Sequence, residues 1–411
     1  MLGRIVRNAA SMLLGTAMGE VLTTYAIGLA AISLGAAGFG TFAAAQAFVD
    51  PFGSLAGFGL GSVAVMVAAR RGGTDAALLG TLLALLAAAS SIAGVVAIVL
   101  GAITGSVPLP LLSVAALGMV VGPLTLAASL PFQFDQAMHK LVAIPLLVSV
   151  VRIATAGAAY YLLRTPLGFQ LSGTIAALAS VALMFWASRR TYARSFAFDP
   201  VLAKELLALA WPAAVLEFVV MAYMRGSYFL LSGAGPTVQG EYAAADRLVR
   251  PFLGLSGALA ASALPSIARI AAARDFARLR VLYAKTIVRC LAAIVPLSVA
   301  ASFVAPWVVR RFAPEYAAAT SPFRVLLVGI LFMFVNQLSS TFIVAMGRFR
   351  LIMAVALVNF VVYVALAVSL IPRFGATGAA IATTVMEAVN TLMQIVIVVS
   401  LLRAEQKKGR P

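Results

Sequence analysis

The chain has 411 residues, of which 63% are apolar and 10% charged, with a mean hydropathy of +1.05. This composition excludes a soluble globular protein, and the continuous apolar runs exclude a membrane β-barrel, whose strands alternate. The net charge of +17 would indicate nucleic-acid binding in a soluble protein, but in a membrane chain it records which loops stay in the cytosol. The single cysteine, Cys290, excludes an intrachain disulfide, and we expect no metal site and no cofactor.

The apolar segments predict an all-α polytopic membrane protein with twelve transmembrane helices, each about 20 residues or longer. In the first half the predicted spans cover residues 9–34, 40–68, 77–103, 111–134, 141–163 and 168–187. In the second half they cover residues 206–231, 240–268, 286–309, 322–345, 351–371 and 376–402. We therefore expect an N-terminal lobe (1–195), a cytoplasmic linker (196–205), a C-terminal lobe (206–402) and a basic cytoplasmic tail (403–411).

The orientation follows from the loops that carry lysine and arginine. With both termini inside, most of the 30 basic residues fall on cytoplasmic loops, including Arg70 and Arg71, the segment 269–285 and the C-terminal tail. Short loops rich in Lys and Arg remain in the cytoplasm, so both termini are predicted to lie there.

An internal repeat relates the two halves. Residues 40–52, GTFAAAQAFVDPF, and residues 240–252, GEYAAADRLVRPF, share their first Gly, the Ala run, a Val and the final Pro-Phe. Repeats of this kind are typical of membrane transporters. The paired positions differ in charge, since Asp50 corresponds to Arg250 and Gln46 to Asp246. The scaffold is therefore duplicated but its polar residues are not.

Several ionisable side chains fall inside the predicted spans. Such a group near the bilayer centre costs at least about 2.5–3.5 kcal/mol, so it usually faces a cavity or a partner. The bases are candidates to bind pyrophosphate or another anion through their guanidinium forks: Arg250, Arg247, Arg225 and Arg152. The acids are candidates for ion coupling or gating: Asp50, Glu20, Glu217, Asp246 and Glu387.

The same groups could instead neutralise one another and pin helices together. Asp246 lies four residues before Arg250, a spacing that permits an ion pair on one helix. Asp50 and Glu20 are the preferred coupling groups, because the first half has few bases near them. Our central hypothesis is that the arginines have no carboxylate partner and that their function is to bind phosphate.

Several stretches along the chain resemble a known family. They are ISLGAAGFGTF (32–42), GFGLG (57–61), GEYAAA (240–245), LPSIAR (264–269), FAPEYAAA (312–319) and LIPRFGATGAAIAT (370–383). Together they are similar to the polysaccharide and O-antigen translocases of the multidrug/oligosaccharidyl-lipid/polysaccharide exporter superfamily. That family often has an arginine before its Leu-Gly turn, where this chain has AAIS (30–33), so no ligand role is assigned there.

The resemblance implies two pseudo-symmetric six-helix lobes around a central cavity, with alternating access. It implies movement of a polyprenyl-pyrophosphate-linked oligosaccharide from the cytoplasmic to the outer leaflet of the inner membrane. The buried acids make H+ and Na+ the candidate coupling ions. The expected partners are this substrate, membrane lipid, and a glycan polymerase or glycosyltransferases, but no nucleic acid.

Three other functions are alternatives to a flippase. A multidrug or small-metabolite antiporter of the same superfamily would favour an acidic lumen, which fits these arginines poorly. An envelope-synthesis enzyme would need a larger extramembrane loop and a catalytic constellation, and the sequence has neither. A membrane scaffold of a glycan-assembly complex predicts that neutral replacements of Asp50 and Arg250 leave export intact.

Overall fold

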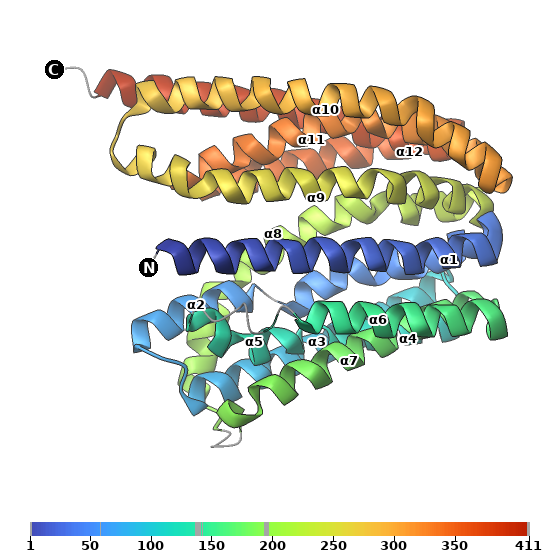
Figure 1. Cartoon of the computed structure of the whole chain (residues 1–411), viewed down its shortest axis with the longest axis horizontal. Helices are drawn as coiled ribbons and strands as arrows, with labels where there is room; N and C mark the ends of the chain where they lie inside the picture. Colours follow the sequence, from blue (N-terminus) through green and yellow to red (C-terminus); the bar gives the residue numbers. More distant parts are fainter. Residues whose placement is uncertain (1, 58, 136–140, 142, 193–196, 409–411) are drawn as a thin grey trace. The chain divides into compact units, whose positions relative to one another are not determined.

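The computed structural model describes residues 2–57, 59–135, 141, 143–192 and 197–408, and the elements found within them are helices (Figure 1). The chain divides into two compact units, Met1–Ser232 and Gly233–Pro411, which are described separately. The first contains α1 (Leu2–Gly57), α2 (Leu60–Arg71), α3 (Ala76–Thr104), α4 (Leu109–Val121), α5 (Leu124–Phe134), α6 (Ala143–Ala158), the π-helical η2 (Ala159–Leu163), α7 (Pro166–Tyr192) and α8 (Pro200–Leu231). After the short 3-10 turn η3 (Ser232–Ala234), the second contains α9 (Pro236–Ala272), α10 (Phe276–Phe312), the 3-10 segment η4 (Pro314–Ala319), α11 (Thr320–Ala345) and α12 (Phe349–Lys408).

Within the described ranges, nine helices are long and apolar enough to cross a membrane. The chain is thus a multi-pass helical membrane protein, as the composition predicted. Two of the helices are interrupted by a glycine with positive φ, α1 at Gly35 (φ 62°) and α12 at Gly375 (φ 53°). The chain changes direction at Gly35 (Figure 1). The count of twelve spans remains a prediction.

The core of the first unit forms where α1 packs against α8, α6 and α3. One buried cluster joins α2, α3, α5 and α8 around Leu82 and Leu86, and another joins α1, α3 and α4 around Phe48 and Leu112. Lipid tails are as apolar as leucine, so close packing and interhelical hydrogen bonds hold such helices together, rather than the hydrophobic effect.

Gly59 allows the second predicted span to break beside α8. It caps α2 in the left-handed conformation (φ 62°), and a Cβ built there would lie 2.8 Å from the Cβ of Ala213. Only glycine satisfies both the backbone angle and the close approach. Gly59 thus permits both the break in the span and the close contact with α8.

The loop between α2 and α3 is organised by Asp75. Its carboxylate accepts the N–H of Leu78 at 2.7 Å, capping α3, and pairs with Arg71 at 2.8 Å. Burial raises the pKa of this carboxyl, but the Leu78 N–H and the Arg71 guanidinium outweigh burial and lower the pKa below its ordinary value. The ionised form therefore stabilises the folded loop.

The second unit is built on α11, which packs against α12 and α9. Its buried cluster includes Tyr283 of α10, whose ring meets Phe342 edge-on and whose hydroxyl lies 2.8 Å from that of Ser339. These contacts fix the face of α10 that points towards α11.

A matching hydrogen bond occurs in both units. In the first, the hydroxyl of Thr174 on α7 donates to the carbonyl of Val114 on α4 at 2.8 Å. In the second, the hydroxyl of Thr384 on α12 donates to the carbonyl of Val325 on α11 at 3.0 Å. Each threonine also lies against a glycine, Gly118 or Gly329, that permits the close approach. The duplication seen in the sequence therefore extends to a contact that the sequence comparison did not detect.

Candidate substrate and coupling sites

In the first unit the structure brings Asp50 of α1 to Arg225 of α8. Arg225 Nε lies 2.7 Å from Asp50 Oδ2, and the two side chains are 16% and 36% exposed, respectively. A pair this short and partly desolvated is worth more than an exposed surface pair, whose typical value is about 0–1 kcal/mol. The two helices are thus held together at this point by charge.

Aromatic contacts flank the pair on both sides. The rings of Phe48 and Phe229 lie 5.0 Å apart, and those of Phe52 and Phe218 lie 6.4 Å apart. Later residues of α1 thus meet earlier residues of α8, so the two segments run antiparallel. Pro51 follows Asp50 inside the helix and cannot donate a backbone hydrogen bond, which loosens the helix at the pair.

This arrangement corrects one expectation about Asp50 and one about Arg225. The first half was thought to offer few bases near it, but Arg225 approaches from the eighth helix, far along the sequence. Arg225 was also expected to be unpaired, and it is held by a carboxylate. No local pattern in the sequence indicates that these two residues meet.

The other candidates of the first unit are not part of this pair. Arg152 on α6 is half-buried, with its guanidinium beside Gly173 of α7. Glu217 on α8 is exposed and forms no ion pair with any residue that the structure describes. Glu20 lies on α1, but its side chain falls outside the described part. Their roles as ligands or coupling groups remain predictions.

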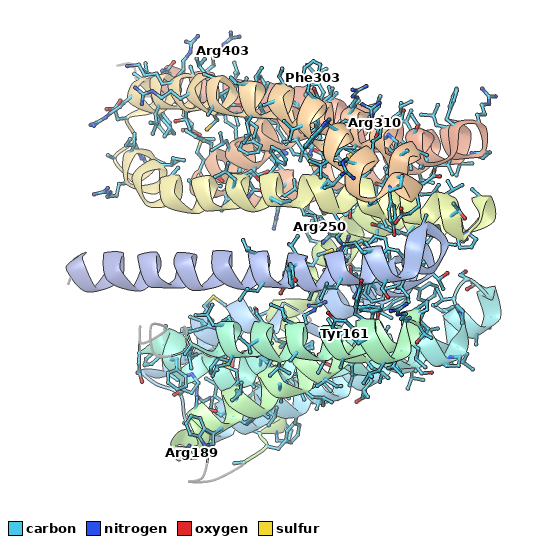
Figure 2. The ribbon with its side chains drawn as sticks, turned by 45° about the vertical axis from the view of Figure 1, so that its right-hand side comes forward. Tyr161, Arg189, Arg250, Phe303, Arg310 and Arg403 are labelled. Carbon is cyan, nitrogen blue, oxygen red and sulfur yellow. The ribbon has the colours of Figure 1, made fainter. Side chains whose placement is uncertain are left out.

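In the second unit the expected pair on α9 is present. Arg250 donates from Nε and Nη2 to Asp246 Oδ2, at 3.1 and 2.9 Å, and both side chains are partly buried. Figure 2 labels Arg250 on α9. Arg247, the next candidate, is also half-buried on this helix. The hypothesis of unpaired guanidinium groups is therefore wrong for Arg225 and Arg250, since each is held by a carboxylate. A phosphate that binds either arginine must compete with that carboxylate.

Among the candidate acids whose side chains the structure describes, Glu387 is the most deeply buried, with 6% of its surface exposed. Its Oε2 accepts the side-chain amide of Asn336 on α11 at 2.6 Å and that of Asn390 at 3.3 Å. Gln394 and Ser340 continue this chain of hydrogen bonds, at 2.9 Å for each step. No cationic side chain among the described residues pairs with Glu387.

Among the residues of the first unit that the structure describes, this amide network has no counterpart. Glu387 lies one turn after Thr384, and the residue one turn after the matching Thr174 is Ala177. Within the described residues, the Oδ1 atom of Asn336 is buried and accepts no hydrogen bond. Sequence reasoning found Glu387 but missed its amide partners, because a single Asn or Gln in an apolar span carries no recognisable pattern.

Comparison with known families covers most of the chain. Residues 5–271 match the family described as polysaccharide biosynthesis protein, and residues 212–369 match the family MatE. No curated protein matches the sequence.

Solved structures share the fold across the whole length. An inward-facing multidrug resistance MATE family transporter of the MOP superfamily has a TM-score of 0.78 at 17% identity, covering 95% of this chain and 96% of the other. The lipid II flippase MurJ, in an inward closed conformation, has a TM-score of 0.75 at 14% identity, covering 94% and 86%. An outward-facing MATE transporter has a TM-score of 0.64 at 17% identity, covering 98% and 96%.

At these identities the solved structures establish the fold alone, which is the MATE-like helical architecture. The family match extends over well over half of the sequence. The chain therefore belongs to the family described as polysaccharide biosynthesis protein.

Proposed function

We propose that this protein flips a polyprenyl-pyrophosphate-linked oligosaccharide from the cytoplasmic to the outer leaflet of the inner membrane by alternating access. The observation that carries the proposal is the ion pair between Asp50 and Arg225, partly buried at 2.7 Å inside the membrane-spanning part. The family match and the fold shared with a lipid II flippase support it. We propose twelve spans in two lobes (1–195 and 206–402), with both termini cytoplasmic and O-antigen-type glycan as cargo.

The chemistry of the pair suits a pyrophosphate cargo. A guanidinium fork binds phosphate oxygens through two parallel hydrogen bonds, and phosphate carries more negative charge than a carboxylate. An arriving pyrophosphate would take Arg225 from Asp50, and the freed carboxylate would then bind a proton or Na+. Anion binding and ion binding are thereby linked at one place.

The second unit offers a further anion position of the same kind. Arg250 is held by Asp246 on the same helix, three residues after Arg247. The fourth candidate, Arg152, lies on α6 of the first unit. Asp246 would act as Asp50 does, so each unit would hold an arginine whose carboxylate partner is displaced when phosphate binds. Glu217 and Glu20 remain candidate gating groups on spans 7 and 1.

Glu387 is our candidate for a second coupling group. A buried carboxylate without a cationic partner gains stability by taking up a proton or a metal cation. The side-chain amides of Asn336 and Asn390, whose nitrogens donate to Glu387, would turn their oxygens towards a bound metal cation. Glu387→Gln keeps the shape and removes the charge. Translocation by this variant should no longer respond to an imposed ion gradient. If the variant responds as the wild type does, Glu387 is not a coupling group.

The decisive experiment measures movement of a lipid-linked oligosaccharide between the leaflets of vesicles that contain the purified protein. Arg225→Gln should reduce the rate about tenfold or more, because a fork that binds phosphate is lost. Arg71→Gln is the matched control, since Arg71 also pairs with an aspartate, at 2.8 Å, but lies at the end of α2 beside the loop to α3. Equal rates for the two variants would contradict the proposal.

A multidrug or small-metabolite antiporter is the second candidate. The MatE match over residues 212–369 and the shared fold with multidrug transporters favour it. Binding of cationic dyes by the purified protein, without binding of any lipid-linked saccharide, would favour this candidate over the flippase.

A further inference from the structure

The turn between α9 and α10 repeats the turn between α2 and α3. Asp75 caps α3 by accepting the N–H of Leu78 at 2.7 Å, and Asp275 caps α10 by accepting the N–H of Arg278 at 2.9 Å. The two aspartates, and the two residues that they cap, are related by the offset of the sequence repeat. The duplication therefore includes this turn, and the first copy serves as a reference for the second.

The charges of the two turns differ. In the first turn, the Asp75 carboxylate also pairs with Arg71 at 2.8 Å. The position that matches Arg71 is Ala271, and Asp275 forms no ion pair with any residue that the structure describes. The second turn has arginine at positions 269 and 278, where the first has alanine and leucine. These two arginines are therefore specific to the second copy.

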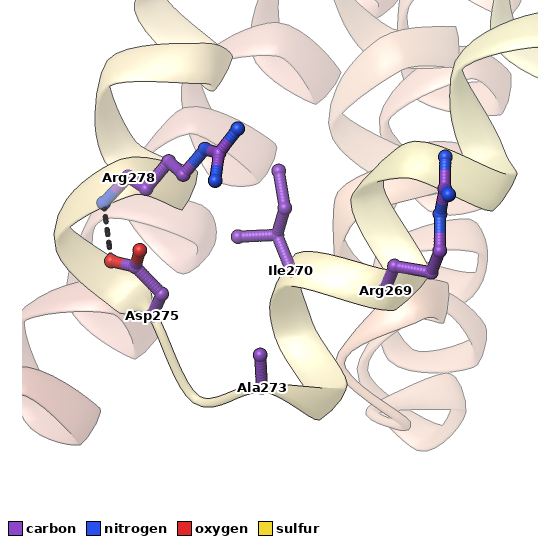
Figure 3. A pocket seen from close by; sticks show the side chains of 5 residues that line it. All are labelled: Arg269, Ile270, Ala273, Asp275 and Arg278. Atoms are coloured by element: carbon purple, nitrogen blue, oxygen red, sulfur yellow. Dashed lines mark hydrogen bonds between the residues drawn. The ribbon is translucent and has the colours of Figure 1, made fainter.

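Both arginines line one pocket in the surface of the second unit. The pocket has a volume of about 380 Å³, and Ile270, Ala273 and Asp275 complete its lining. Arg269 and Arg278 stand on two sides of it, with Ile270 between them (Figure 3). Both are exposed, and neither forms an ion pair or a side-chain hydrogen bond within the described part of the chain. The pocket thus offers the donors of two guanidinium groups to one ligand.

The backbone of the turn is held on both sides of the pocket. Arg274 has a left-handed conformation (φ 56°), and its N–H donates to the carbonyl of Ala271. The N–H of Asp275 donates to the carbonyl of Ile270, which completes the Schellman pattern that ends many helices. Because Asp275 also caps α10, the two pocket arginines are carried by fixed helix ends. A site held in this way loses little entropy when a ligand binds.

The pocket lies outside the predicted membrane-spanning segments, which end at residue 268 and resume at residue 286. Its ligand therefore comes from water or from the headgroup layer. The segment 269–280 contains four arginines and one aspartate, a net charge of +3. A surface of this charge at the edge of the membrane favours an anionic ligand.

Phosphate is the anion that best suits two arginines. Its oxygens accept parallel hydrogen bonds from a guanidinium fork, and a phosphate monoester carries about 1.5–2 negative charges at neutral pH. The volume of the pocket lies at the lower end of the range for small-molecule sites, about 300–1,000 Å³, which leaves room for an organic group beside the phosphate. Ile270 and Ala273 offer apolar surface to such a group.

We propose that this pocket binds the phosphate group of a small organic phosphate, which is either a soluble compound or the headgroup of a phospholipid at the membrane surface. Arg269 and Arg278 hold the phosphate, and Ile270 contacts the organic group. Asp275 fixes the turn, and its negative charge limits the affinity. The site is separate from the arginines proposed to bind the cargo, and it does not depend on the flippase function.

The probe for the test is glycerol 3-phosphate, which is also the phosphate-bearing part of a phospholipid headgroup. Its binding to the full-length protein in detergent is measured by titration calorimetry at low ionic strength. Arg269→Gln and Arg278→Gln should each raise the Kd about fivefold, the most that an exposed ion pair is ordinarily worth. Asp275→Asn should lower the Kd, because asparagine caps a helix as well as aspartate does but carries no charge.

Arg280→Gln is the matched control for the charge. Arg280 is exposed like Arg278, but it lies about 200° around α10 from it and lines an apolar groove between α10 and α12. Its loss should leave the Kd unchanged. Arg225→Gln should also leave the Kd unchanged, which separates this pocket from the proposed cargo site. Unchanged melting temperatures show that the variants are folded.

Nanodiscs distinguish the two sources of the phosphate group. The titration is repeated in nanodiscs of phosphatidylcholine alone and of phosphatidylcholine with phosphatidylglycerol. If a lipid headgroup occupies the pocket, phosphatidylglycerol should raise the Kd of glycerol 3-phosphate for the wild type more than for Arg278→Gln. If the ligand is soluble, phosphatidylglycerol should change both Kd values by the same factor, through its surface charge alone.

The proposal is wrong if the wild type does not bind glycerol 3-phosphate, or if Arg269→Gln and Arg278→Gln bind it as the wild type does. It is also wrong if Arg280→Gln or Arg225→Gln loses as much affinity as Arg278→Gln, because the pocket would then not be the site. A folded Asp275→Asn variant with a raised Kd would contradict the electrostatic argument. Equal affinity for inorganic phosphate would show that the organic group makes no contact, and it would also contradict the proposal.

Discussion

If phosphate displaces the Asp50 carboxylate from Arg225, removing that carboxylate should strengthen the binding of phosphate. Asp50→Asn removes the charge that competes for Arg225 and keeps the size of the side chain. It should therefore tighten the binding of inorganic pyrophosphate to the protein. If Asp50 served only to hold α1 and α8 together, its loss would weaken or leave unchanged the binding of any ligand.

The magnitude follows from the distance between the charges. At 2.7 Å, Coulomb's law gives about 1.5 kcal/mol at the dielectric constant of water and about 6 kcal/mol at an effective value of about 20. Desolvation offsets much of the larger figure, and the 36% exposure of Asp50 screens the pair further. A net coupling of about 1–2 kcal/mol remains, which corresponds to about 5- to 30-fold in affinity.

The assay is titration calorimetry with pyrophosphate on the detergent-solubilised protein at low ionic strength. Asp50→Asn should lower the Kd by that factor, Arg225→Gln should raise it, and the double variant should behave like Arg225→Gln. Asp75→Asn is the control, because it frees Arg71 from an ion pair of nearly equal length in a loop. An unchanged or raised Kd for Asp50→Asn, or an equal gain for Asp75→Asn, would refute the reasoning.

Three further predictions concern stability in detergent. Gly59→Ala should destabilise the protein by about 1–3 kcal/mol because its backbone is left-handed, whereas Gly73→Ala, with open space around it, should change the melting temperature little. Asp75→Ala should cost about 1 kcal/mol at neutral pH. The folded state lowers the pKa of Asp75, so the difference in unfolding free energy between the wild type and Asp75→Ala should narrow as the pH falls below about 4. Acid-unfolding curves measure this, and a constant difference would contradict the role of ionised Asp75 in the loop. Asn336→Leu should cost about 2–3 kcal/mol, and most of it should return when Glu387→Leu is added; additive losses would argue against a coupled pair.

The positions of several helices could be predicted closely from the sequence. The span predicted over 322–345 lies within α11 (Thr320–Ala345), and the one predicted over 77–103 lies within α3 (Ala76–Thr104). Apolar runs bounded by Gly, Pro and charge are local features, so a linear reading detects them. The points where helices begin and end were less predictable. α8 begins at Pro200, inside the predicted linker, because Asp199 caps it and its N–H donates to Thr81 of α3 at 2.9 Å.

The composition and the repeat by themselves determined a duplicated helical membrane protein and a short list of costly ionisable groups. Both conclusions rest on properties of single segments. The tertiary structure decided which groups meet: Asp50 with Arg225 instead of remaining alone, Glu387 with amides instead of a base, and α10 with α12 around an apolar groove. The physical reason is that pairing depends on the rotation and depth of helices far apart in the chain, and side-chain contacts across helices set these.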